Sequence, residues 1–354
     1  MILRLKDGKK YYKSKGLQYM KKIMFYRNLF YLGGTEIAIL NLIKNLNGYE
    51  IYIAYTDESS DVELLNRYKK YAKIVKLDDK SSYSVDTLII TSLFKPNVDI
   101  NKVIKRNKTI LWTHYFVKQG TSFTSDEKFY DMADEIVTVS ETSRKIILDQ
   151  DYENKIDKKI NVIYNIIDTE EIIDKSEIEK KIELSDQLNL VSVGRVCYEK
   201  GFKRQLELAR LLKKNNIDFK WYIIGGNYSK EIEEEIIGEY NELKDNFVFT
   251  GFLDNPFNIM KQCDYLVLLS DNETWGLVIT EAKILGVPCI VTDFDVAYEQ
   301  IIDNKTGIIL SRDDVDSYEE KIPLIINNKK IYKENLKSFK WSNDLIIKKW
   351  ERIL

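Results

Sequence analysis

The chain is expected to fold as an α/β protein with two doubly wound parallel sheets, one after the other. Short runs rich in Ile and Val alternate with longer amphipathic segments from end to end. These runs are continuously apolar, which is typical of parallel strands covered by helices on both faces. A polar, charged stretch at 168–187 divides them into two series. With 354 residues, the chain is long enough for two domains that each bury a core.

The elements follow in order along the chain. Six strands are predicted in the first series, at 23–25, 51–54, 87–90, 109–113, 135–139 and 161–164. Five are predicted in the second series, at 189–193, 221–224, 247–250, 265–269 and 289–291. Between strands, apolar residues repeat at the spacing of one helix face, as at Ile39, Leu42, Ile43 and Leu46. Two such sheets leave a crevice at the carboxyl ends of their strands, where open α/β sheets bind ligands.

Composition and charge exclude several classes of protein. Lys+Arg 54 against Asp+Glu 56 gives a net charge of -2, which argues against a nucleic-acid binder that works through a basic surface. No apolar run approaches the ~18 residues of a membrane span, and no signal peptide follows Met1. Three cysteines at no metal-ligand spacing indicate reduced thiols. We therefore expect a cytoplasmic protein.

The first 27 residues differ from the rest of the chain in charge. Residues 1–27 hold nine basic residues and one acid, a net charge of +8, which leaves -10 on the remainder. One interpretation is an ordinary solvated segment. The other is a peripheral contact with anionic lipid at the inner face of the membrane, which gains about 1 kcal/mol for each Lys or Arg near the surface.

Two cations lie in the loop after the first strand of the second series. Gly194-Arg195 is followed by Glu199-Lys200-Gly201 and then by an amphipathic segment. A guanidinium and an ammonium on one loop suit a diphosphate, and the glycines allow the backbone to approach it closely. A solvated loop with surface cations is the competing interpretation. The spacing of a P-loop is absent.

A second strand end carries two carboxylates. The segment Ser-Asp-Asn-Glu-Thr-Trp-Gly-Leu-Val-Ile-Thr-Glu-Ala places Glu273 in a loop and Glu281 in a helix expected to start near Leu277. Carboxylates accept hydrogen bonds from vicinal hydroxyls, which are typical of sugars. The backbone N–H groups of Trp275, Gly276 and Leu277 would form an anion site at the start of that helix. For either glutamate alone, an ordinary charged residue at or on a helix is the simpler interpretation.

Taken together, the two motifs resemble the retaining family-4 glycosyltransferases of the GT-B fold. The Gly-Arg and Lys-Gly pairs are followed about eighty residues later by E-x7-E and then by Gly-Val-Pro. Three further segments agree with the family, at 133–140, 162–168 and 249–257. The second is similar to the family's domain-crossing V-I-P-N-G-V-D, and the third to bacterial surface-polysaccharide members. The resemblance spans roughly 21–354, with departures at Tyr164, Thr274 and the Ile-Gly-Gly that begins at Ile224.

The resemblance implies a division into domains. Residues 1–168 would form an N-terminal, acceptor-binding domain of the Rossmann type. It would be completed by about 338–354, a terminal helix with Trp341 and Trp350 that crosses back to it. Residues 169–337 would form the C-terminal domain that binds the nucleotide sugar.

The resemblance also implies roles for residues of the second half. Arg195 and Lys200 would bind the diphosphate of the donor and stabilise the charge that grows on the leaving nucleotide. Glu281 would hold the ribose hydroxyls. Glu273, together with the amides of 275–277, would orient the donor sugar and its distal phosphate.

The first half contributes a glycine pair and a histidine. Gly33-Gly34 lies at a strand-to-helix turn, where Thr35 is the expected N-cap, and the resemblance implies that Gly34 lies beside the donor phosphates. His114 is the only histidine and follows the strand predicted at 109–113. A lone histidine is more often structural, but the resemblance implies a ligand contact near the transferred sugar. The glycines implied to contact the donor are Gly34, Gly194 and Gly225.

We therefore expect a retaining hexosyltransferase that needs neither a metal nor a cofactor. Its donor would be a nucleotide sugar, UDP-linked by family frequency. Its acceptor would be a glycan or a lipid-linked glycan in the synthesis of a bacterial surface polysaccharide or capsule. An alternative of another class is a non-catalytic GT-B-like partner subunit that binds a sugar nucleotide or a protein without transfer.

Two further alternatives stay open at this stage. Asp293-Phe294-Asp295 matches the D-x-D metal site of a different transferase fold, although it lies late in the chain for such a site. A sugar-nucleotide epimerase on the same fold would need catalytic acids and histidines in the crevice. The chain has a single histidine.

Overall fold

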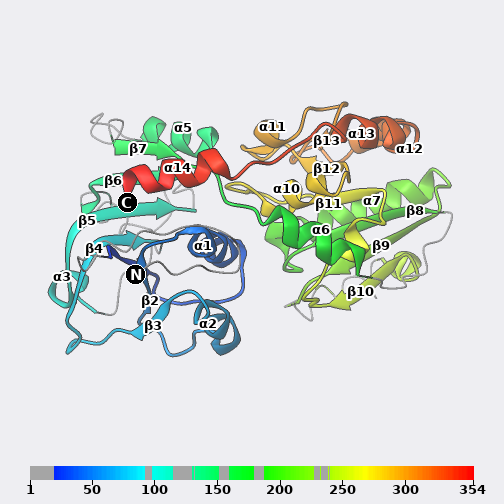
Figure 1. The fold of residues 1–354 in the computed structure, drawn as a ribbon. Helices are drawn as coiled ribbons and strands as arrows, with labels where there is room; N and C mark the ends of the chain where they lie inside the picture. Colours follow the sequence, from blue (N-terminus) through cyan, green and yellow to red (C-terminus); the bar gives the residue numbers. More distant parts are fainter. Residues whose placement is uncertain are drawn as a thin grey trace.

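Two parallel sheets, of seven and six strands, organise the chain (Figure 1). The computed structural model describes residues 20–91, 98–114, 130, 132–150, 159–178, 187–226, 232, 238 and 240–354. Each pair of neighbouring strands in these ranges runs parallel. The predicted class, two doubly wound α/β sheets in a GT-B arrangement, is confirmed.

The first sheet has the strand order β3-β2-β1-β4-β5-β6-β7. Its strands are β1 (Lys22–Tyr26), β2 (Glu50–Tyr55), β3 (Lys73–Lys76), β4 (Tyr83–Ile90), β5 (Ile104–Thr113), β6 (Glu135–Thr138) and β7 (Ile160–Val162). The helices in this half are α1 (Gly34–Asn45), α2 (Val62–Tyr68), α3 (Ile100–Val103) and α5 (Glu141–Gln150). The winding reverses between β1 and β4, so the loop that leaves β1 borders the crevice.

The second sheet has the order β10-β9-β8-β11-β12-β13. Its strands are β8 (Leu188–Val193), β9 (Phe219–Ile224), β10 (Phe247–Gly251), β11 (Tyr265–Leu268), β12 (Cys289–Thr292) and β13 (Gly307–Leu310). Its helices are α6 (Thr169–Glu177), α7 (Phe202–Lys214), α9 (Phe257–Met260), α10 (Leu277–Ile284), α11 (Ala297–Gln300), α12 (Tyr318–Asn327) and α13 (Lys329–Leu336), with short 3-10 turns at Tyr198–Lys200 and Asn241–Leu243. Here the winding reverses between β8 and β11, the two strands that precede the predicted motifs.

All eleven predicted strands are present, and two strands were missed. The edge strand β3 has the sequence Lys-Ile-Val-Lys, with both lysines exposed and only Val75 buried. Its exposed lysines protect the sheet edge against pairing with another chain, but they also interrupt the apolar pattern by which a strand is recognised. The other missed strand, β13, is fully buried but only four residues long. A run this short cannot be assigned from periodicity alone.

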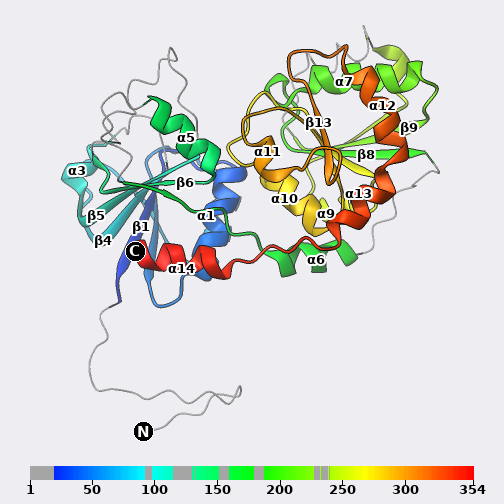
Figure 2. The same ribbon diagram turned by 90° about the horizontal axis from the view of Figure 1, so that it is seen from above.

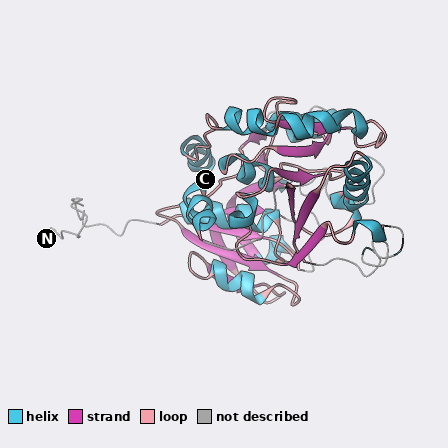
Figure 3. Ribbon diagram, turned by 90° about the vertical axis from the view of Figure 1, so that its right-hand side faces the viewer, coloured by secondary structure: helices cyan, strands magenta, loops and turns pink. Residues whose placement is uncertain are grey.

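Helices enclose the strands, as the side view in Figure 3 shows. The predicted face of α1 is buried, since Ile39, Leu42 and Ile43 are at most 3% exposed. These residues belong to an apolar cluster that continues into the second half, where Leu266 and Ile279 are fully buried. The two halves therefore share buried contacts near the crevice.

The chain crosses between the halves twice, and the terminal helix α14 (Asp344–Ile353) returns to the first sheet (Figures 1 and 2). Trp350 packs on Trp112 with ring centroids 4.8 Å apart. Lys108 Nζ donates a 2.6 Å hydrogen bond to the carbonyl of Ile353. The predicted return of the terminal helix is confirmed. The placement of Trp341 on that helix was wrong, because the helix begins at Asp344.

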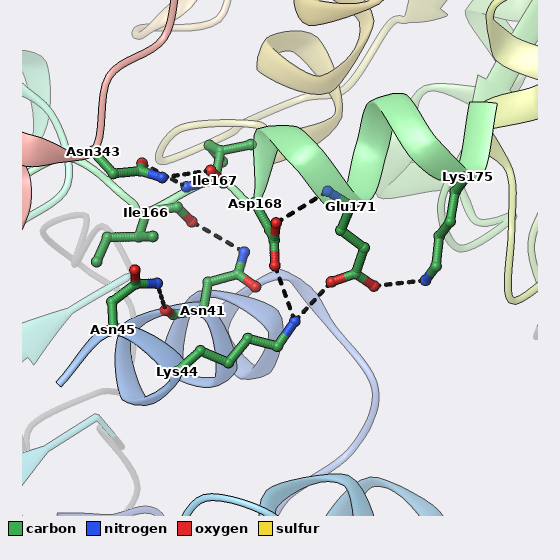
Figure 4. A network of polar contacts seen from close by, with 9 residues as sticks. All are labelled: Asn41, Lys44, Asn45, Ile166, Ile167, Asp168, Glu171, Lys175 and Asn343. Carbon is green, nitrogen blue, oxygen red and sulfur yellow. Dashed lines mark hydrogen bonds and ion pairs between the residues drawn. The ribbon is translucent and has the colours of Figure 1, made fainter. Parts of the chain in front are cut away.

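The two crossings are tied together and to α1 by polar contacts (Figure 4). The side-chain amide of Asn343 donates to the carbonyl of Ile167 at 2.7 Å and accepts from its N–H at 3.1 Å. Lys44 of α1 forms ion pairs with Asp168 at 3.2 Å and with Glu171 at 2.7 Å. Partial burial opposes ionisation of Glu171, but hydrogen bonds from Lys175 and Lys44 lower its pKa to about 2. This network holds the first crossing against the N-terminal half.

The structure removes one basic residue from the lipid contact predicted at the N-terminus. Residues 1–19 lie outside the described residues. Arg27, counted among the basic residues of 1–27, is 3% exposed and paired with a buried carboxylate, so it cannot reach lipid. The reason is its position directly after β1, a central strand of the first sheet. Among the described residues, no helix is long and apolar enough to span a membrane.

Candidate active site

A cavity of about 670 Å³ lies between the two halves. All of the predicted site residues line it: Gly34, His114, Gly194, Arg195, Lys200, Gly225, Glu273, Trp275, Gly276, Leu277 and Glu281. They come from the ends of β1, β5, β8, β9 and β11 and from the start of α10. A volume of this size is within the range of ligand pockets, roughly 300–1,000 Å³.

Lys200 and Glu273, 73 positions apart, form an ion pair in this cavity. The distance from Lys200 Nζ to Glu273 Oε1 is 2.6 Å, and the Ser270 hydroxyl donates to the same oxygen at 2.8 Å. The contact depends on Gly201, whose φ of +71° lets α7 start directly against β11. A Cβ at this glycine would lie 1.6 Å from the carbonyl oxygen of Leu269. A side chain there would therefore push Lys200 away from Glu273.

Arg195 is held more loosely than Lys200. Its side chain is 52% exposed and lies 3.3 Å from the carboxylate of Glu199, a surface contact of the kind that contributes little stability. The glycine before it lies close to Gly225, since a Cβ on Gly225 would be 1.7 Å from the carbonyl oxygen of Gly194. The two glycines bring the ends of β8 and β9 together beneath the two cations. The expected pair of cations is present on one wall, each with a carboxylate beside it.

The helix α10 begins at Leu277, where the sequence placed it, with Gly276 as its N-cap. Among the described residues, no side chain caps this helix start. The N–H groups of Leu277 and Val278, two residues of the cavity lining, have no hydrogen-bond partner in the described part of the chain, whereas the N–H of Ile279 donates to the carbonyl of Gly276 at 2.9 Å. One turn into the helix, burial raises the pKa of Glu281 to about 7. Within the described ranges, no hydrogen bond or ion pair engages its carboxylate. This wall combines anion-binding amides with a carboxylate that is ready to accept hydroxyls.

The opposite wall comes from the first half. A Cβ built on Gly34 would lie 3.8 Å from the Leu277 side chain, so this turn faces the start of α10 across the cavity. The N-cap of α1 is Gly33, and the prediction of Thr35 as the cap was wrong because the helix starts one residue before it. Glu36 of α1 also lines the cavity and is 1% exposed.

A buried ion pair underlies this wall. Arg27 Nε lies 2.8 Å from Glu36 Oε1, and the same guanidinium donates to the carbonyl of Thr91 at 2.8 Å. Burial raises the pKa of Glu36, although the charge of Arg27 opposes the shift. This pair could not be predicted from the sequence, because the two residues are separated by a turn and look like ordinary surface charges.

His114 lies at the end of β5 and is 8% exposed. Its ring packs on Trp112 with centroids 4.6 Å apart. Burial, and then the nearby charge of Arg27, lower the pKa of His114 to about 3, so the imidazole is neutral at physiological pH. Its Nε2 has no hydrogen-bond partner among the described residues. A buried polar atom without a partner, on a cavity wall, indicates a ligand or a water molecule as its partner.

Two further residues of the cavity wall were missed by the sequence analysis. Asn165 lies in the first crossing and is 2% exposed, and no described residue satisfies its Oδ1. Arg67 of α2 is half-buried and has no ion-pair partner in the described part of the chain. Arg67 also lines a neighbouring cavity of about 220 Å³ that shares Glu281 and Phe252 with the larger one. Of the two, only Asn165 could have been found from the sequence, because it lies in the segment that resembles the family's domain crossing.

The D-x-D alternative finds no support in this geometry. Asp293 accepts a 2.8 Å hydrogen bond from the backbone N–H of Arg312, Phe294 is fully buried, and neither aspartate lines the cavity. The described residues contain no group of three or more His, Cys, Asp or Glu side chains placed to hold a metal ion.

Comparison with known proteins shows similarity to glycosyltransferases. Residues 174–339 match the family model of glycosyl transferases group 1. An uncharacterised glycosyltransferase of Haemophilus influenzae is 25% identical over 95% of this chain and all of that protein. The O-antigen biosynthesis glycosyltransferase WclY of Escherichia coli is 28% identical over 75% of this chain and 78% of its own. Anabaena HepE, solved with UDP-glucose, superposes with a TM-score of 0.76 over 94% of this chain and all of HepE, at 16% identity.

Proposed function

We propose that this chain is a group 1 glycosyltransferase, which transfers a sugar from a nucleotide-sugar donor to a growing surface glycan. The observation that carries the proposal is the convergence of the eleven predicted residues on one cavity. Its C-terminal wall presents Lys200, Arg195 and the free amides of α10, which together suit a diphosphate. HepE, with a similar fold, was solved with UDP-glucose, which supports a UDP-linked donor here.

The wall also supports a division of roles during transfer. Lys200 is paired with Glu273, so a diphosphate that bound the ammonium would release the carboxylate toward the sugar hydroxyls. Arg195 and the start of α10 would stabilise the negative charge that develops on the leaving phosphate. The ribose hydroxyls would donate to Glu281. These steps need no metal ion to neutralise the diphosphate, since two cations and a helix start are already at hand.

The N-terminal wall suits a neutral sugar. His114 is uncharged, and its Nε2 and the Oδ1 of Asn165 have no hydrogen-bond partner among the described residues. We infer that the transferred sugar lies against these groups and that the acceptor enters beside α2, where Arg67 lines the cavity. Retention of configuration would follow attack on an oxocarbenium-like centre from the face of the leaving phosphate. That phosphate would take the proton of the acceptor hydroxyl.

The acceptor is proposed to be a glycan or a lipid-linked glycan of a bacterial surface polysaccharide, handled in the cytoplasm at the membrane face. The similarity to WclY, an O-antigen biosynthesis glycosyltransferase, supports this class. The basic N-terminal residues before β1 support a location close to anionic lipid.

The experiment is nucleotide release from UDP-, GDP-, ADP- and TDP-sugars with EDTA present. The native protein is compared with Glu281→Ala and with the control Glu320→Ala, an exposed glutamate of α12. Slow release from one donor by the native and control proteins, lost in Glu281→Ala, would support the proposal. No release and no nucleotide binding across the panel would contradict it and favour the non-catalytic partner subunit.

A further inference from the structure

Three aromatic rings meet at the end of the cavity where the chain crosses between the halves. We call Tyr164, Trp275 and Trp341 the aromatic junction. Ring centroids are 4.9 Å apart for Tyr164 and Trp275, 5.9 Å for Trp275 and Trp341, and 6.4 Å for Tyr164 and Trp341. All three distances fall in the range of favourable aromatic pairs.

Each ring of the aromatic junction comes from a different functional segment. Tyr164 belongs to the first crossing, directly before Asn165, which lines the cavity. Trp341 belongs to the second crossing, just before α14. Trp275 belongs to the turn that starts α10 and contributes Gly276 and Leu277 to the cavity wall. Both crossings therefore touch the turn expected to bind the donor.

Hydrogen bonds behind Trp275 fix the same turn. The indole N–H of Trp275 donates to the Thr280 hydroxyl at 3.0 Å, and that hydroxyl donates to Gln300 Oε1 at 2.9 Å. The amide nitrogen of Gln300 donates to the carbonyls of Trp275 and Gly276, the latter at 3.2 Å. The carbonyls of the turn are thus held away from the cavity. The position of this turn therefore depends on the Trp275 ring and on α11.

The other side of the aromatic junction is anchored to both halves. The Tyr164 hydroxyl donates to the Glu299 carboxylate at 3.4 Å. That carboxylate, from α11, also accepts the N–H groups of Glu141 and Thr142 at the start of α5, at 3.2 and 2.5 Å. One short helix of the second half therefore holds the donor turn through Gln300 and the first half through Glu299.

We infer that Tyr164 and Trp341 are positioning residues, which hold the donor turn at 275–277 in a fixed position relative to the two crossings. Neither side chain lines the cavity, so neither can touch the donor directly. Any effect of their removal on donor affinity must pass through Trp275. By reciprocity, binding of the donor's diphosphate to the turn stabilises the crossing geometry in which these rings are packed. This inference rests on the proposed function, because it assigns the turn to the donor.

The test uses Trp341→Ala and its conservative partner Trp341→Phe. The control is Tyr83→Ala, a half-buried tyrosine whose ring lies 6.3 Å from Tyr52, on the first sheet and outside the cavity lining. We expect Trp341→Ala to raise the dissociation constant and KM for the donor about tenfold, within the usual range of coupling between sites. Turnover at saturating donor should change less than about threefold, because the groups at the reacting centre remain. Trp341→Phe should restore most of the affinity.

A second variant keeps the test decisive if Trp341→Ala fails to fold. Tyr164→Leu keeps apolar volume but removes the ring and the bond to Glu299. It should weaken donor binding to a similar degree, and the double variant with Trp341→Phe should deviate from additivity, since the rings touch.

Four outcomes separate the explanations. Weaker binding in the folded Trp341→Ala or Tyr164→Leu variant, with recovery in Trp341→Phe and no change in Tyr83→Ala, supports the inference. Native affinity in folded Trp341→Ala and Tyr164→Leu variants overturns it. An equal loss in Tyr83→Ala also overturns it, because the effect would then reflect general destabilisation. Failure of the native protein to bind any nucleotide would instead count against the proposed function.

Discussion

The two walls of the cavity hold their charges in different ways. On the C-terminal wall, Lys200 and Arg195 are 28% and 52% exposed. Lys200 is paired with Glu273 of the cavity wall, and Arg195 with the exposed carboxylate of Glu199 beside the cavity. On the N-terminal wall, Arg27 and Glu36 are 3% and 1% exposed and neutralise each other behind the surface. A pair at the surface can exchange its partner for a ligand, whereas a buried pair cannot open without leaving a charge uncompensated.

This difference separates two tasks within one site. The C-terminal wall offers exchangeable cations and free amides to a charged donor. The N-terminal wall offers uncharged hydrogen-bonding groups, the imidazole of His114 and the amide of Asn165, to the part of the ligand that carries no charge. Variants of the two walls should therefore fail in different measurements.

The largest expected effect is on folding, from the buried pair of the N-terminal wall. Arg27→Met leaves Glu36 buried without a partner and should lower the free energy of unfolding by about 3–5 kcal/mol at pH 8. The loss should shrink at low pH, because burial already raises the pKa of Glu36 and the isolated carboxyl can then take up a proton. Urea denaturation at pH 8 and pH 5 measures both values.

The double variant Arg27→Met/Glu36→Leu is the control for this pair. It should recover most of the lost stability, because no unpaired charge remains. A single variant that loses less than about 1 kcal/mol would show that the pair contributes no more than an exposed ion pair, which would contradict the difference between the two walls.

The next largest effect is on transfer, from the C-terminal wall. Lys200→Ala should lower kcat/KM about 10²–10³-fold, the usual cost of removing one group that stabilises developing charge. Donor affinity should fall as well, because Glu273 would then face the diphosphate without its cation. Lys203→Ala, an exposed cation three positions along the chain, is the matched control and should behave as the native protein. Equal activity of the two variants would remove Lys200 from the mechanism.

His114→Ala should have a smaller and different effect. Loss of one neutral contact to the transferred sugar should lower turnover about 10–100-fold at saturating donor. The dissociation constant of the free nucleotide should stay within about twofold of the native value, since no charged contact is removed. Steady-state kinetics and calorimetry together measure the split. A large loss of nucleotide affinity with unchanged turnover would contradict the assignment of His114 to the uncharged part of the ligand.

The smallest effect expected is a pH dependence carried by Glu281. Its raised pKa means that the carboxyl is protonated below about pH 7 and can then accept fewer hydroxyl bonds. Affinity for the donor should fall about tenfold from pH 8 to pH 6, following the ionised fraction. A nucleotide sugar must be used, because a terminal phosphate titrates near pH 6 itself. Glu281→Gln should show a flat profile, and a native slope retained in this variant would assign the titration to another group.

The raised pKa of Glu281 also predicts how the stability of the protein depends on pH. Because the folded pKa of Glu281 lies above its unfolded value, the stability linked to this group is present at low pH and is lost as pH rises through about 7. Glu281→Gln should therefore stabilise the free protein above pH 7 and have little effect at pH 5.

Much of the C-terminal wall could be predicted from the sequence, because its groups lie in short segments at strand ends. The cations of one loop and the E-x7-E segment are local patterns, and the helix expected to start near Leu277 begins at that residue. Their mutual arrangement follows from parallel winding, which brings the ends of β8 and β11 together.

The N-terminal wall was less predictable, since its features depend on packing between distant segments. Arg27 looked like one more cation of a basic terminus, and only the fold shows that it is buried at the end of a central strand. Arg67 lies on a short helix between the exposed Asn66 and the buried Tyr68 and carries no sequence signal. The edge strand β3 was missed for a related reason, because its exposed lysines obscure its apolar centre.

The most direct test is to compare donor binding between one variant from each wall. Calorimetric titration with the nucleoside diphosphate of the donor found in the release experiment should give similar affinities for the native protein and His114→Ala. Affinity should be at least about tenfold weaker for Lys200→Ala, as expected when a charge-assisted contact to phosphate is lost. Equal losses in both variants, or an unchanged affinity in Lys200→Ala, would contradict the assignment of the donor's charge to the C-terminal wall.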